Sequence, residues 1–183
     1  QQASGAGKDR DTYRAAIGQS LRRLTDIESA AGHHDDAIRY ATEARKNADA
    51  QGNRFDLFES IESLANALRD AGRLDEAYRA FDEYHRLRQT HSADHRTRVK
   101  TLEELRDIRM TQGRFEDALE LSRQMWPLPA DGPAALQDTE HLGNCARFAL
   151  AAWAALKKAR PDSPAPPELA RWTAAAAALP KPD

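Results

Sequence analysis

A short pattern recurs along the chain at a spacing of 40 to 41 residues. AGHHDDA at 31–37 aligns with AGRLDEA at 71–77 and with QGRFEDA at 112–118. The glycines Gly32, Gly72 and Gly113 are 40 and then 41 residues apart, and the alanine that follows each glycine keeps the same spacing. Such a period is typical of arrays in which each small unit buries its apolar face against its neighbours. We therefore expect stacked repeats, not one globular core closed around a catalytic pocket.

Each copy of the pattern lies between two stretches with helical periodicity. Around the second copy the apolar positions are Phe58, Ile61, Leu64, Ala65 and Leu68 before it, and Ala77, Phe81, Tyr84 and Leu87 after it. Their spacing predicts two amphipathic helices. The glycine is expected to end the first helix in a left-handed conformation, and the acidic pair behind it to open the second, where free N–H groups favour negative charge. Each repeat is thus predicted to be a helical hairpin.

The run His33-His34-Asp35-Asp36 offers four potential metal ligands, but the repeat favours a turn. Acidic residues recur at the positions of Asp35 and Asp36 in every copy, whereas the histidines are replaced by Arg and by Leu or Phe. Side chains on consecutive turn residues also diverge, which opposes metal binding. His91 and His95 would lie one turn apart in a helix and are the remaining metal alternative.

The pattern resembles the tetratricopeptide repeat family. The middle copy matches best, at Ile61, Leu64, Ala65, Leu68, Gly72, Leu74, Ala77, Phe81 and Tyr84. In the outer copies Glu28 and Arg109 stand where that family has a large apolar residue, and Ile27 or Ile108, one residue earlier, could turn inward instead. The period of 40 to 41 is similar to the elongated repeats of kinesin light chains and bacterial regulators.

The resemblance implies an all-α fold, a right-handed solenoid of antiparallel helix hairpins. We expect a disordered leader over 1–11, three repeats over about 12–51, 52–92 and 93–126, a degenerate fourth hairpin over 127–179 that caps the array, and a disordered tail over 180–183. In the cap, Cys145 and Trp153 are expected to pack in the core.

Composition narrows the classes of function. The 183 residues carry a formal net charge of −2 and a single cysteine, so neither a nucleic-acid binder nor a disulfide-bonded protein is indicated. No apolar run approaches the roughly 20 residues of a membrane span. With no nucleophile motif or phosphate-binding loop, we expect no enzyme, no cofactor and no bound metal. The Ala-, Arg- and Asp-rich composition resembles that of bacterial proteins, and the expected location is the cytoplasm.

The resemblance implies that function lies on the inner face formed by the first helix of each repeat, where such arrays grip a peptide or a partner helix. The expected partner-binding residues are Arg22, Arg23, Asp26, Glu59, Glu62, Ser63, Asn66, Lys100, Glu103 and Asp107, with Glu104 beside them. Some members clamp a terminal carboxylate with Lys and Asn. Asn66 and Lys100 match that clamp, but the acidic residues of the same face, such as Glu62 and Glu103, would repel a carboxylate.

The acidic inner face favours a partner segment that carries Arg or Lys, and Arg22 and Arg23 favour an acidic group at the N-terminal end. The leading hypothesis is a non-catalytic protein–protein interaction scaffold. The alternative is a regulatory or sensor module of a larger bacterial signalling or transcription-regulatory protein. A homodimer is a further candidate assembly, because exposed end helices of repeat arrays self-associate.

Overall fold

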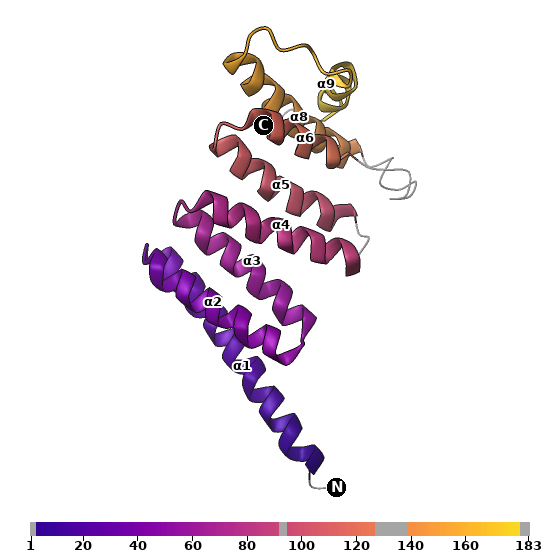
Figure 1. Cartoon of the computed structure of the whole chain (residues 1–183). Coiled ribbons are helices and arrows are strands. Elements are labelled where there is room, and N and C mark those ends of the chain that lie inside the picture. The colour runs from indigo at the N-terminus through magenta and orange to yellow at the C-terminus, as the bar shows by residue number, and fades with distance from the viewer. Residues whose placement is uncertain (1–2, 92–94, 127–138, 180–183) are drawn as a thin grey trace. The chain divides into compact units, whose positions relative to one another are not determined.

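The computed structural model describes residues 3–91, 95–126 and 139–179, and within them the regular structure is entirely α-helical. The helices are α1 (Ala3–Ala30), α2 (His34–Gln51), α3 (Arg54–Asp70), α4 (Leu74–His91), α5 (His95–Thr111), α6 (Phe115–Gln124), α8 (Thr139–Ala159) and α9 (Leu169–Ala177) (Figure 1). None of these helices is both long and apolar enough to cross a membrane. The predicted all-α class is confirmed. The chain forms two compact units, residues 1–87 and 88–183, and each is described by itself.

The three repeated glycines occupy equivalent corners. Gly32, Gly72 and Gly113 have φ values of 78°, 72° and 70°, which only glycine adopts without strain. In each corner the residue after the glycine donates its backbone N–H to the carbonyl five residues earlier. The three bonds, each 2.9 Å long, are His33 to Glu28, Arg73 to Leu68 and Arg114 to Arg109. This pairing is the Schellman cap, so the predicted helix–turn–helix corner is confirmed at all three copies.

A fourth left-handed glycine, which the repeat pattern did not reveal, joins the first hairpin to the second. Gly52 ends α2 with a φ of 64°. The next residue, Asn53, caps α3 by accepting backbone hydrogen bonds from Phe55 and Asp56 through its side-chain oxygen, at 3.1 and 3.4 Å. The linker between hairpins is therefore fixed by one glycine and one side-chain cap.

In the first unit, helix α2 packs through small side chains. Four alanines of α2, Ala37, Ala41, Ala44 and Ala48, are buried, and α2 packs against both α1 and α3. An alanine stripe lets neighbouring helices approach closely, because its methyl groups fill little space. A larger apolar cluster of Phe58, Ile61 and Tyr84 links α3 to α4, with the rings of Phe58 and Tyr84 edge to face at 6.4 Å between centroids.

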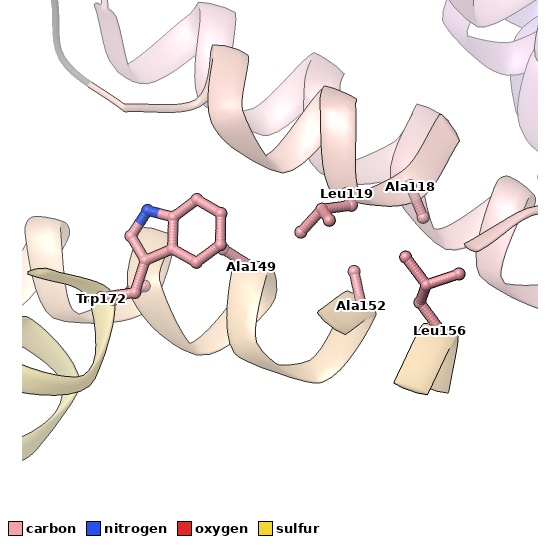
Figure 2. Close-up of a cluster of buried hydrophobic side chains, with 7 residues drawn as sticks. Ala118, Leu119, Ala149, Ala152, Leu156 and Trp172 are labelled. Atoms are coloured by element: carbon pink, nitrogen blue, oxygen red, sulfur yellow. The ribbon is translucent and has the colours of Figure 1, made fainter. Parts of the chain in front are cut away.

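The second unit is packed around a tryptophan. Trp172 of α9 is 2% exposed and lies beside Ala149 of α8, facing Leu119 of α6, in a cluster that also includes Ala152 and Leu156 (Figure 2). Gly143 of α8 leaves room for Leu179, which follows the end of α9, since a Cβ at this position would collide with the Leu179 side chain. Cys145 is fully buried, as predicted, and Trp153 packs half-buried on the same cluster.

Two details of the sequence analysis require correction. The leader expected to be disordered over 1–11 is helical from Ala3 onward, because extending an existing helix costs far less than starting one. Ile27 is 61% exposed and does not turn inward, whereas Ile108 does and is 1% exposed. The expected linker over 127–138 and the expected tail over 180–183 lie outside the described residues.

Candidate functional site

A polar hollow of about 420 Å³ lies between α1 and α3 in the first unit. We call it the first groove. It is lined by Thr25, Asp26, Ser29 and Ala30 from α1 and by Ser63, Asn66, Ala67, Arg69 and Asp70 from α3. Both helices are first helices of their hairpins, so this is the face on which the sequence analysis placed partner binding.

The first groove has an acidic carboxylate on each wall. Asp26 of α1 and Asp70 of α3 are both exposed to solvent. Asp70 pairs loosely with Arg69, whose Nε lies 3.7 Å from Oδ1, and the Arg69 guanidinium also lies 5.8 Å from the centre of the Phe81 ring. The Ser63 Oγ is buried without a hydrogen-bond partner in the chain, and the Asn66 amide lines the groove. The groove can therefore attract a cation and offer it polar partners.

A second hollow, of about 370 Å³, lies between α5 and α8 in the second unit. We call it the second groove. Its lining is Arg96, Val99, Lys100 and Glu103 from α5 and Glu140, His141 and Asn144 from α8. Burial, followed by the nearby Asp107 carboxylate, raises the pKa of Glu103 above its ordinary value. Because acid and base are mixed here, the second groove carries less negative character than the first.

A chain of hydrogen bonds beside the second groove fixes one histidine tautomer. The Arg98 guanidinium lies 2.8 Å from Nδ1 of His95, and Nε2 of His95 lies 2.7 Å from Nε2 of His141. A guanidinium only donates, so Nδ1 of His95 must accept and its proton sits on Nε2, which donates to His141. His141 then carries its own proton on Nδ1. The Cys145 Sγ, 3.7 Å from the same Nε2, extends the chain into the core.

The predicted inner-face residues fall into two groups. Five of them line the grooves: Asp26, Ser63 and Asn66 the first groove, and Lys100 and Glu103 the second groove.

The other predicted residues are not in the grooves. Arg22 pairs with Asp56 across α1 and α3, with Nη2 3.3 Å from Oδ1, and Glu62 accepts a 3.1 Å hydrogen bond from the Tyr84 hydroxyl. Asp107 pairs with Arg106 beside it. Arg23 is exposed and Glu59 is half-buried, and neither lines a groove.

The histidine and aspartate run at 33–36 takes part in a helix turn. His33 bonds Glu28 through Nδ1 at 2.7 Å, and Asp36 pairs with Arg39 at 2.7 Å. Asp35 and Asp36 lie in the first turn of α2, as predicted. His91 ends α4 and His95 begins α5, so they do not share a helix face. Among the described residues no group of three His, Cys, Asp or Glu side chains is placed to hold a metal ion.

Sequence reasoning missed most of each groove, six of the nine residues that line the first and five of the seven that line the second. Arg69 and Asp70 lie at the end of α3 where other copies have different residues, so the repeat frame gave no signal for them. Glu140 and His141 open α8, outside the three clear repeats. One signal was available, because Asp70 directly precedes the repeated corner and so must lie near the equivalent end of α1.

Two solved structures resemble the chain along most of its length. Both contain the nearly identical TPR-like repeats of a Podosopora anserina protein of kinesin-light-chain type, one of them as a single-substitution variant. The variant gives a TM-score of 0.55 at 20% identity and the other 0.54 at 19%, and each match covers 87% of this chain and 86% of the other. No family model and no curated protein matched. The likeness establishes an all-helical, TPR-like repeat fold.

Proposed function

We propose that the protein is a non-catalytic interaction scaffold that binds a peptide or partner helix carrying basic side chains. The fold supports this, because repeat arrays of helix pairs expose extended faces suited to elongated partners. The single observation that carries the proposal is the first groove, in which Asp26 and Asp70 approach one hollow from two different helices.

The charges of the first groove favour an Arg or Lys side chain as the bound group. The groove has two carboxylates, Asp26 and Asp70, and one guanidinium, that of Arg69. This guanidinium already contacts Asp70 and the Phe81 ring. The Asn66 amide oxygen supplies a further acceptor of the kind that a guanidinium or ammonium group requires. Arg22 does not serve as a receptor for an acidic group in this proposal, because Asp56 holds it.

The test compares binding of short synthetic peptides that contain paired arginines with binding of matched peptides that contain glutamate instead. The variant Asp26→Lys with Asp70→Lys reverses the charge of the first groove. We expect this double variant to lower the affinity for the arginine peptides by about tenfold or more, because repulsion between like charges replaces attraction. Affinity is measured by fluorescence anisotropy at two salt concentrations.

The matched control is Glu43→Lys with Asp49→Lys. Both residues are exposed on α2 and lie outside the first groove, so the control changes net charge equally. If the control weakens binding as much as the groove variant does, the attraction is a general charge effect and the assignment to the groove fails. Equal affinity for arginine and glutamate peptides would also reject the proposal.

A further inference from the structure

Helix α1 bears a row of large apolar side chains that its own unit leaves in solvent. Tyr13 is 73% exposed, Ile17 52%, Leu24 36% and Ile27 61%. At 100° per residue these four fall within an arc of about 80° on the helix. The exposed small residues Ser20 and Ala31 complete the row. We call the six residues Tyr13, Ile17, Ser20, Leu24, Ile27 and Ala31 the α1 stripe.

The α1 stripe is not the face with which α1 joins its own unit. From residue 12 onward the buried positions of α1 are Gly18 and Thr25, which lie about 140° and about 120° around the helix from Tyr13, at the centre of the stripe. On that buried side the Asn47 amide of α2 donates a 2.7 Å hydrogen bond to the Arg14 carbonyl. Asp26, in the first groove, also points away from the stripe. The stripe is therefore a third surface of the helix, separate from both the core and the groove.

The repeat shows what this face does elsewhere in the same unit. Forty residues later, the counterparts of Ser20, Leu24 and Ile27 in α3 are Ser60, Leu64 and Ala67, and all three are buried. Over these three positions the same helix face is thus covered in α3 and uncovered in α1. The 28-residue α1 is also longer than the 18-residue α2, and Figure 1 shows it running on beyond α2 toward the N-terminus.

The spacing of the α1 stripe suits a second helix. Its six positions follow one another at intervals of four, three, four, three and four residues, which is the repeat that keeps two helices in contact along a common seam. We propose that the α1 stripe pairs with the α1 stripe of a second copy of this chain, antiparallel, about a two-fold axis. An isologous contact of this kind closes the assembly at two copies.

Side-chain sizes favour the antiparallel arrangement. With residue 22 at the axis, Tyr13 meets Ala31 of the second copy, Ser20 meets Leu24, and Ile17 meets Ile27, so that large side chains face small or equal ones. A parallel pair would set Tyr13 against Tyr13 and Ser20 against Ser20, which crowds one layer and leaves a void in another.

Charges at the flank of the α1 stripe also favour the antiparallel arrangement. Arg14 is brought beside Glu28 of the second copy, once on each side of the axis. His33 occupies only one oxygen of the Glu28 carboxylate, Oε2, and leaves Oε1 for this contact. The same arrangement sets Arg23 beside Arg23 of the second copy, which opposes pairing. A parallel pair would instead place Arg23 beside Glu28 of the second copy.

The first experiment measures molar mass against concentration for the whole chain, by light scattering and sedimentation. We expect the wild type to be a dimer. The double variant Ile17→Lys with Ile27→Lys should raise the dissociation constant of this dimer by about 100-fold or more, because each isoleucine buried in the contact contributes substantially to binding. Phe55→Lys is the control, because Phe55 is exposed on α3, outside the stripe. Circular dichroism verifies that each variant stays folded. A monomeric wild type, or a control that dissociates equally, overturns the proposal.

The second experiment separates the two arrangements by charge. Arg14→Glu alone and Glu28→Arg alone should each weaken the dimer by about tenfold, and the double variant should restore it. In a parallel pair the double variant would set the arginine introduced at position 28 beside Arg23, and the dimer would not be restored. Arg23→Gln should tighten an antiparallel dimer and weaken a parallel one. Failure of the double variant to recover rejects the antiparallel arrangement. Binding of the arginine peptides to these stripe variants is measured separately, because the stripe lies outside the first groove and the two proposals can therefore fail independently.

Discussion

The two units of the chain solve the same packing problem with different side chains. In the first unit, α2 presents four buried alanines to both of its neighbours. In the second unit, α9 contributes a single fully buried large residue, Trp172, to a cluster shared with α6 and α8 (Figure 2). Packing around α2 therefore depends on many small contacts at close approach, and packing around α9 on one large anchor.

This difference predicts different sensitivities to mutation. We call the contact that α2 makes through its buried alanines the small-residue seam. It tolerates no added volume, because the closely spaced helices leave no room for a larger side chain. An anchored cluster tolerates no loss of volume, because removal of the anchor leaves a cavity that the surrounding helices cannot fill. The first two of the following three predictions test whether α2 and α9 differ in this way, and the third tests a partly buried charge in the second groove.

The largest effect is expected for Trp172→Ala. Removal of this side chain should reduce the free energy of unfolding of the second unit by about 3–5 kcal/mol. Chemical denaturation measures the loss, and amide hydrogen exchange locates it in α6, α8 and α9. Trp172→Phe, which keeps most of the buried area, should lose clearly less. Equal loss of protection in α1, α2 and α3 would contradict the view that the anchor serves its own unit.

A smaller loss is expected for Ala41→Leu in the first unit. Three added carbon atoms at a fully buried position should cost about 1–3 kcal/mol through overpacking between α2 and its neighbours. Ala50→Leu makes the same change at an exposed position of the same helix and should be nearly neutral. If Ala41→Leu left the denaturation midpoint unchanged, the small-residue seam would not limit helix spacing.

The smallest effect is expected for Glu103→Gln in the second groove. Burial raises the pKa of Glu103, so the folded state binds this proton more tightly than the unfolded state does. Stability is then lost as pH rises above the ordinary value of 4.5 and through the raised folded-state pKa. The variant should therefore be more stable than wild type at pH 7, by less than about 1 kcal/mol because the group is partly solvated.

Thermal melts at several pH values measure this effect. The advantage of Glu103→Gln should shrink as pH falls and disappear well below 4.5, where the wild-type carboxyl is protonated in both states. Glu104→Gln, one residue along α5, is the matched control. An advantage that does not change with pH would show that burial of the ionised carboxylate is not its source.

The corners and helix starts were predictable because they depend on local chemistry. A left-handed glycine followed by an acidic pair determines a turn wherever it occurs, and His33, Asp35 and Asp36 could be assigned from their counterparts in other copies. The grooves were predictable only in small part, at three residues of the first and two of the second. Asp26 and Glu103 lie on the expected helix face, but Arg22 and Glu62 lie on it too and are held by Asp56 and Tyr84 from neighbouring helices.

The repeating helical hairpin follows from local chemistry alone, since glycine conformation, helix-end charge and apolar spacing act over a few residues. Which of two similar positions is buried depends instead on how the helices pack. Ile27 and Ile108 occupy equivalent places, yet one is exposed and the other enclosed, because burial depends on whether another helix covers that face. The residues of a helix determine which of its faces is apolar. Whether that face is removed from water depends on whether a neighbouring helix covers it.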